Sequence, residues 1–321
     1  SVGAGFRSLR GLASRSQTVK QPGTRVTVMS GGRNVIPRNE SASAFVPGHV
    51  TTFFSVHRRE DPARTGSRGG GITLSEGTTV EVKLREETRI LLDGTETSVR
   101  PVERVLDAMD VTARVTITAD LPVGAGFGVS GGATLGTAIA ANRAAGCGYT
   151  ENELVRTAHV AEVEAGTGLG DVVAQARGGL PIRLEPGAPE HGRLDGIPAS
   201  PRVEYVSFGS VSTEDVLSGD TSTLTAAGER ALADLRAEPT TDRLVELSRR
   251  FAREADLLTD RVADAVAAVR AEGGDAAMAM LGDTAFAFGD GLSSAGYDPE
   301  VCAVHPTGAT LRPPRLDRFE R

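Results

Sequence analysis

A glycine-rich segment between a predicted strand and a predicted helix restricts the fold of this chain most. Residues 122–133 read PVGAGFGVSGGA. Residues 112–118 before them alternate between polar and apolar side chains, which predicts a half-buried strand, and residues 130–144 predict a helix of small side chains. Glycines let backbone N–H groups turn toward an anion, and a helix that begins near Ser130 adds free amides and the positive end of its dipole. The segment therefore predicts a phosphate-binding loop.

Lysine is nearly absent, which excludes two familiar ways of binding a nucleotide. Only Lys20 and Lys83 among the 35 Lys and Arg residues are lysine. Neither stands in a Gly-Lys-Ser/Thr sequence, so P-loop nucleoside triphosphatases are excluded. No His-Arg-Asp or Asp-Phe-Gly follows Lys83, so protein kinases are excluded too. Gly126, Gly128 and Gly131 match the dinucleotide fingerprint, but the acidic strand end expected about 20 residues later does not follow them.

The hydrophobic pattern predicts an α+β protein with two lobes. Strands are expected at 43–46, 51–56, 72–74, 79–84, 89–92, 180–184, 203–208, 284–288 and 300–304, and helices at 99–109, 151–165, 224–236, 241–258 and 260–271. Thr150 and Glu153 form a capping-box pattern, and the glycines of 66–71 predict a turn. The proline- and glycine-rich segment 185–201 predicts the connection between lobes of residues 41–185 and 186–321.

Charge and composition limit the partners of this protein. Residues 1–40 hold seven Lys or Arg and one acid, which predicts a disordered basic leader. The whole chain has a net charge of −7, which argues against nucleic-acid binding. The uncharged run 121–142 includes a proline and six glycines, so no membrane span is predicted. Cys147 and Cys302 fit neither a disulfide scaffold nor a zinc site.

Three polar residues after the loop suggest chemistry. His159 and Glu162 share one face of the helix predicted at 151–165, and Asp171 follows a second glycine loop. Glu162 and Ser130 could hold Mg²⁺ through oxygen ligands. Asp171 could accept or orient a hydroxyl proton.

Taken together, these segments resemble the three motifs of the GHMP kinase superfamily. They are Pro47-Gly48-His49-Val50, the loop Gly126–Ser130, and Ala158-x-x-x-Glu162 before Gly-x-Gly-Asp171. The second motif is usually Pro-x-x-x-Gly-Leu-Gly-Ser-Ser-Ala, and this chain has Phe127 for Leu and Val129 for the first Ser. The resemblance implies a two-lobed α+β fold, with a mixed or antiparallel sheet and helices in the ATP-binding N-terminal lobe and a ferredoxin-like C-terminal lobe.

The resemblance also assigns roles to residues. It implies that Ser130 and Glu162 bind Mg²⁺ and that Asp171 is catalytic. It implies that ATP is held by Pro122, Gly124, Gly126, Gly128, Ser130, Gly131 and Gly132. Residues 280–284 stand where the third, glycine-rich motif belongs, although only Gly282 of it remains and Asp283 would lie near phosphate.

Within the superfamily, the chain resembles the archaeal pantoate kinases most specifically. The segments that carry this resemblance are 47–54, 66–72, 122–132, 158–183 and 280–287. It implies a cytoplasmic, homodimeric enzyme that uses ATP to phosphorylate the primary hydroxyl of pantoate in coenzyme A biosynthesis. Arg183 is expected to bind the pantoate carboxylate, since a guanidinium can bind it with two hydrogen bonds, and Ser67, Arg68 and His159 match further substrate-pocket positions.

Three alternatives stay open at this point. The chain could phosphorylate another small alcohol, such as mevalonate, homoserine or shikimate. It could be a nucleotide-binding regulator without catalytic activity. It could also be a dinucleotide-dependent enzyme that uses the glycine fingerprint of the loop.

Overall fold

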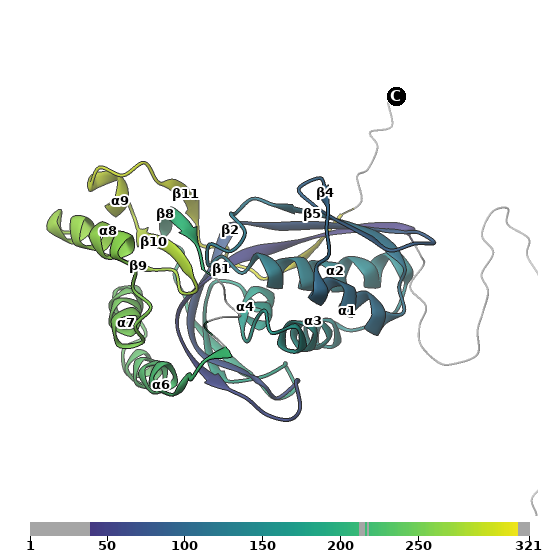
Figure 1. Ribbon diagram of the computed structural model, residues 1–321, viewed down its shortest axis with the longest axis horizontal. Coiled ribbons are helices and arrows are strands. Elements are labelled where there is room, and N and C mark those ends of the chain that lie inside the picture. The colour runs from purple at the N-terminus through teal and green to yellow at the C-terminus, as the bar shows by residue number, and fades with distance from the viewer. Residues whose placement is uncertain (1–38, 212–215, 217, 314–321) are drawn as a thin grey trace, which may run out of the picture. The chain divides into compact units, whose positions relative to one another are not determined.

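The computed structural model describes residues 39–211, 216 and 218–313, and it contains two β-sheets with helices packed against them (Figure 1). In the larger sheet the strand order is β12-β1-β2-β5-β3-β4, and β6 and β7 extend from β2. Its strands are β1 (Ser41–His57), β2 (Gly66–Leu84), β3 (Arg89–Leu92), β4 (Thr95–Glu96), β5 (Ala113–Ala119), β6 (Leu180–Glu185), β7 (Arg193–Ile197) and β12 (Thr310–Arg312).

The smaller sheet is antiparallel, with the order β11-β8-β10-β9. Its strands are β8 (Arg202–Ser210), β9 (Ala276–Met278), β10 (Gly282–Phe288) and β11 (Glu300–Ala303). The helices are α1 (Arg100–Met109), α2 (Val129–Ala145), α3 (Glu151–Ala165), α4 (Asp171–Arg177), α6 (Ser222–Ala237), α7 (Thr241–Glu254), α8 (Asp260–Ala271) and α9 (Gly291–Ser294). This mixture of sheets and helices confirms the predicted α+β class.

Helix α2 lies against β1 and β2, with α1 and α3 beside it on the same face of the larger sheet (Figure 1). Its small side chains allow close packing, since a Cβ at Gly136 would lie only 2.6 Å from the side chain of Val80. Helix α3 begins with the predicted capping box, in which Thr150 and Glu153 bond each other's backbone N–H. Among the described residues, no helix is long and apolar enough to cross a membrane.

The strands β1 and β2 are much longer than the sequence suggests. Each was predicted as two short pieces, and the glycines of 66–71 as a turn, but both strands are continuous and pair along almost their full length. The turn prediction was wrong because these glycines serve close approach within a sheet. A Cβ at Gly71 would collide with His49, and one at Gly69 would collide with the carbonyl of Phe53.

The first and last described strands lie side by side, because β12 pairs antiparallel with β1. Just before β12, the segment 305–309 packs against the end of α4: the N–H of Ala309 donates to the carbonyl of Gln175, and a Cβ at Gly308 would collide with the backbone of Ala176. The sequence did not predict β7, β9 or β12. The lobe boundary at residue 185 stays a prediction, and residues 1–38 of the predicted leader lie outside the described residues.

Candidate active site

The glycine-rich loop before α2 forms one wall of a cleft of about 310 Å³. Gly124, Gly126 and Gly128 have φ angles of 80°, 88° and 64°, a region of backbone conformation that favours glycine. Helix α2 begins directly after Gly128, which has no side chain with which to cap the first turn. The amides of that turn are therefore available to an anion, as the sequence predicted.

The segment around Gly282 packs directly against this loop. Thr284 donates a hydrogen bond of 2.9 Å to the carbonyl of Ala125, and a Cβ at Gly282 would collide with the same carbonyl. Met280 and Leu281 line the cleft, so the segment lies beside the loop as the resemblance implied. The carboxylate of Asp283, however, is bonded to Thr259 and Arg261 and is almost fully buried.

Glu162 is a buried carboxylate surrounded by hydroxyl groups. One of its oxygens accepts hydrogen bonds from Ser130 (2.8 Å) and Thr134 (2.6 Å), and the other accepts one from Thr167 (2.7 Å). Its side chain is only 2% exposed. Burial raises its pKa above the ordinary value, although the three hydroxyls oppose that effect. Ser130 and Glu162 thus meet at the start of α2 as an all-oxygen pair, which suits a hard cation.

Asp171 is the first residue of α4, and its side chain, 26% exposed, lines the cleft. One carboxylate oxygen lies 2.7 Å from Nδ1 of His49, a buried residue of β1. Desolvation works to raise the pKa of Asp171, but the hydrogen bond from His49 and the charges of His49 and Arg183 outweigh it, so the pKa is lowered. The ionised carboxylate can only accept, so Nδ1 carries the hydrogen.

Arg183 is a buried guanidinium without a hydrogen-bond partner on two of its nitrogens, Nε and Nη1, among the described residues. It is 1% exposed, and burial lowers its pKa to about 10, partly offset by the charge of Asp171. It is therefore a cation at neutral pH. A Cβ at Gly170 would lie 2.7 Å from Nε of Arg183 and would collide with Oγ of Ser67, so Gly170 brings these two side chains together next to Asp171.

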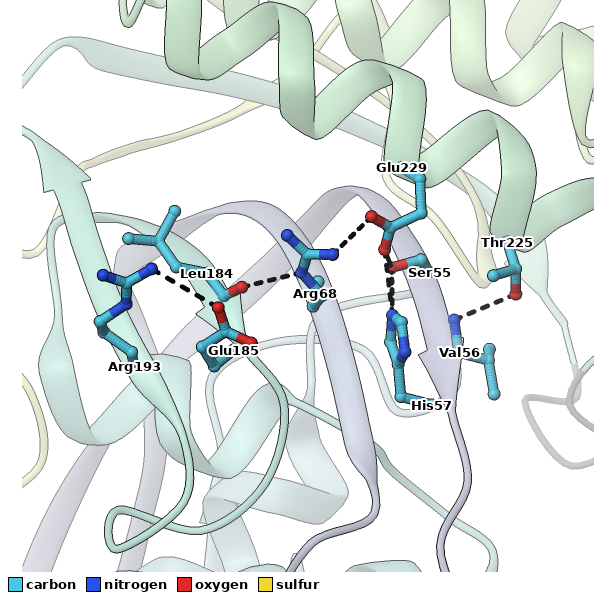
Figure 2. A network of polar contacts seen from close by, with 9 residues as sticks. All are labelled: Ser55, Val56, His57, Arg68, Leu184, Glu185, Arg193, Thr225 and Glu229. Atoms are coloured by element: carbon cyan, nitrogen blue, oxygen red, sulfur yellow. Dashed lines mark hydrogen bonds and ion pairs between the residues drawn. The ribbon is translucent and has the colours of Figure 1, made fainter.

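Arg68 does not join Ser67 and Arg183, because neighbouring residues of a strand point to opposite faces. Figure 2 shows its guanidinium turned toward the carboxylate of Glu229 on α6. The ion pair measures 2.5 Å, and Arg68 also donates to the carbonyl of Leu184 (2.8 Å). Ser55 and His57 bond the same carboxylate. Arg68 therefore ties β2 to α6 and β6.

His159 is buried on α3, one turn before Glu162. Its Nε2 lies 2.8 Å from the carbonyl of Thr65, two residues before Ser67. Burial lowers its pKa, although the bond to Thr65 opposes that effect. The ring is therefore neutral at physiological pH, and it links α3 to the start of β2.

Several residues of the site were not predicted as site residues. They are His49 beside Asp171, Thr134 and Thr167 beside Glu162, and Gln175 on α4. The segment Pro47-Gly48-His49 was noticed as a motif, and that motif was the available signal for His49. No local pattern distinguishes Thr134 or Thr167 from other threonines.

Comparison with known proteins identifies the family. The family model for the GHMP kinases N terminal domain matches residues 97–179. The pantoate kinase of Thermococcus kodakarensis is 34% identical over 241 residues, covering 69% of this chain and 78% of that protein. The pantoate kinase of Methanocaldococcus jannaschii is 31% identical over 274 residues, covering 81% and 99%.

Solved structures show the same fold. A phosphotransferase related to the CoA biosynthesis pathway superimposes with a TM-score of 0.76 at 28% identity, covering 85% of this chain and 98% of that one. A homoserine kinase from Cytophaga hutchinsonii has a TM-score of 0.63 at 16% identity over the same shares. The second likeness concerns the fold alone.

Proposed function

This chain belongs to the pantoate kinases of the GHMP kinase superfamily, and on that premise we propose that it transfers the γ-phosphoryl group of ATP to the primary hydroxyl of pantoate. The observation that carries the substrate assignment is the buried Arg183, whose charge interacts with that of Asp171 and whose Nε and Nη1 have no hydrogen-bond partner among the described residues. A small hydroxy acid can bind its carboxylate there and keep its hydroxyl near the Asp171 carboxylate.

The glycine loop and the first turn of α2 would bind the phosphates of ATP. Without a lysine in the loop, backbone N–H groups and the helix dipole supply the attraction. Positive φ angles at Gly124, Gly126 and Gly128 shape the loop without strain. The closed packing of Gly282 against Ala125 keeps this backbone in place.

Ser130 and Glu162 fit a magnesium site. Their oxygens are the ligands that Mg²⁺ prefers, and Mg²⁺ commonly takes one or two protein ligands and completes its shell with phosphates and water. An ion held by these two residues would offset the negative charge of the phosphates. Thr134 and Thr167 hold the Glu162 carboxylate in a fixed orientation.

Asp171 would receive the proton of the pantoate hydroxyl. As that oxygen bonds to the γ-phosphorus, the bond from phosphorus to the ADP oxygen breaks, and the hydroxyl proton passes to the carboxylate. His49 orients the carboxylate through its Nδ1–H, and its hydrogen bond keeps Asp171 ionised before the reaction. The products are 4-phosphopantoate and ADP.

The test is ADP release by the purified protein with ATP, Mg²⁺ and pantoate, with mevalonate, homoserine and shikimate in parallel. We expect release with pantoate only. Release with another alcohol alone would reject pantoate as the substrate, and ATP binding without release in any reaction would indicate a regulator. The homodimer that the resemblance implies is checked separately by sedimentation velocity.

A further inference from the structure

The segment Pro47–His49 of β1 is a junction between the phosphate-binding loop and the helix that carries Asp171. The backbone N–H of His49 donates to the carbonyl of Phe127 in the loop (2.9 Å). The carbonyl of Pro47 accepts a hydrogen bond of 2.9 Å from Nε2 of Gln175 on α4. The side chain of His49 reaches Asp171, also on α4. Three elements that are distant in sequence thus meet at three consecutive residues.

Gln175 completes this junction with a single amide group. Its Nε2 donates to Pro47 and also to the carbonyl of Gly128 at 3.0 Å. An amide nitrogen has only two hydrogens, so both are used on backbone acceptors, one in β1 and one at the end of the loop. The side chain is fully buried, so water cannot replace either bond.

Gln175 also stands one helical turn after Asp171, on the same face of α4. Both side chains touch the start of α2: a Cβ at Gly131 would lie 2.7 Å from Oε1 of Gln175 and 3.1 Å from Cβ of Asp171. The helices α2 and α4 are therefore packed without spare room at this point. The amide of Gln175 is the group that hydrogen-bonds Gly128 itself to α4, beside the link that His49 makes between Phe127 and Asp171.

We propose that Gln175 is a positioning residue, which holds the phosphate-binding loop at a fixed distance from Asp171 through its bonds to Gly128 and Pro47. The inference rests on the proposed function, in which the loop binds the phosphates and Asp171 receives the proton. A displacement of about 1 Å between reacting groups can lower a rate about 100-fold. Loss of the two hydrogen bonds that Gln175 donates should therefore lower kcat.

The experiment compares Gln175→Met, which keeps the side-chain length but donates no hydrogen bond, with the wild type. Thr137→Val is the matched control, because Thr137 is fully buried in α2 and donates one bond of 2.7 Å to the carbonyl of Ala133, away from the cleft. Turnover, both KM values, ATP affinity by calorimetry and the unfolding temperature are measured for each protein.

For Gln175→Met we expect kcat to fall about 10- to 100-fold and ATP to bind more weakly, while the pantoate KM stays within about twofold of the wild type. Gln175→Glu should behave in the same way, because its carboxylate cannot donate to two carbonyls. Thr137→Val should lower the unfolding temperature but leave kcat unchanged.

A purely structural role of Gln175 would lower the unfolding temperature and leave kcat and ATP affinity unchanged. If Gln175→Met only unfolds at a lower temperature and matches the wild type in kcat and ATP affinity, the inference is wrong. If the wild type binds ATP but does not phosphorylate pantoate, the proposed function fails, and the calorimetric comparison of the same variants still decides whether Gln175 holds the loop.

Discussion

Two buried charges flank Asp171, and their surroundings are opposite. Glu162 on α3 accepts hydrogen bonds from three hydroxyls of its own chain. Arg183 on β6 is equally buried, but its Nε and Nη1 have no partner among the described residues. The charge of Asp171 affects the pKa of both groups.

The difference indicates what each side of the cleft is built to bind. Three hydroxyls fix the orientation of the Glu162 carboxylate and oppose the rise in its pKa that burial causes, and its oxygens suit a cation, which would favour the ionised form. A buried guanidinium without a partner destabilises the folded protein until an anion binds to it. We therefore expect the Glu162 side to act on the nucleotide and its metal, and the Arg183 side to act on the pantoate carboxylate.

The largest effect is expected where the two sides meet. Asp171→Asn keeps the size of the side chain but cannot accept the hydroxyl proton, so kcat should fall about 10²- to 10⁴-fold. ATP affinity by calorimetry should change little, because both sides of the cleft are intact. Turnover equal to that of the wild type would reject the role of Asp171.

Arg183→Met tests the substrate side directly. Loss of the guanidinium should raise the pantoate KM about 100-fold and leave the ATP KM nearly unchanged. Arg183→Lys should recover only part of the loss, because an ammonium cannot make the paired bonds of a guanidinium. An equal rise in both KM values would show that the two sides are not separate.

Arg183→Met should also change the stability of the protein. Removal of a buried charge whose Nε and Nη1 lack hydrogen-bond partners among the described residues should raise the unfolding temperature of the ligand-free protein by a few degrees, roughly the effect of 1 kcal/mol. Glu162→Gln is the comparison, since its carboxylate is already satisfied and the gain should be smaller. A lower unfolding temperature for Arg183→Met would mean that Arg183 has a stabilising partner.

A smaller effect is expected from pH. Burial lowers the pKa of His159, so below the ordinary histidine pKa of about 6.5 the unfolded chain binds a proton that the folded chain resists. The contribution of His159 to the free energy of unfolding is therefore fully present above about pH 6.5. It is lost as the pH falls toward the lowered pKa of the folded protein. His159→Gln should remove part of this pH dependence of the free energy of unfolding, measured by urea titration at pH 5 to 8. His49 is expected to contribute with the same sign.

The smallest effect is expected at Arg68. Its partners are Glu229 and the carbonyl of Leu184, and its partly exposed ion pair should contribute about 1 kcal/mol or less. Arg68→Gln should therefore change the pantoate KM only about twofold, with a small loss of stability. If Arg68→Gln raised the pantoate KM as much as Arg183→Met, Arg68 would belong to the substrate pocket, as the family resemblance implied.

The residues of the cleft differ in how well the sequence predicts them. The capping box at Thr150 and the loop before α2 are local signals, and the helix and loop they predict are present. Strand β2 was misread, because a glycine-rich strand and a glycine-rich turn have the same composition. That misreading concealed the alternation that turns Ser67 and Arg68 to opposite sides.

Long-range pairs could not be derived from the sequence pattern. His49 and Asp171 are 122 positions apart, and nothing near either residue specifies their bond. The same holds for the hydroxyls of Thr134 and Thr167, which become important only because Glu162 is buried between them. The residue pattern suggested Ser130, Glu162 and Asp171, the family resemblance assigned them roles, and only packing brings their neighbours to them.

The pairing of β12 with β1 also affects how the protein matures on the ribosome. The far end of the helix with Asp171 is covered by residues 305–309, which follow that helix in the chain and are therefore made after it. Synthesis proceeds at about 5–20 residues per second, so the end of α4 stays incompletely packed for several seconds after it emerges. A nascent chain should therefore gain protease resistance around α4 only once β12 has emerged.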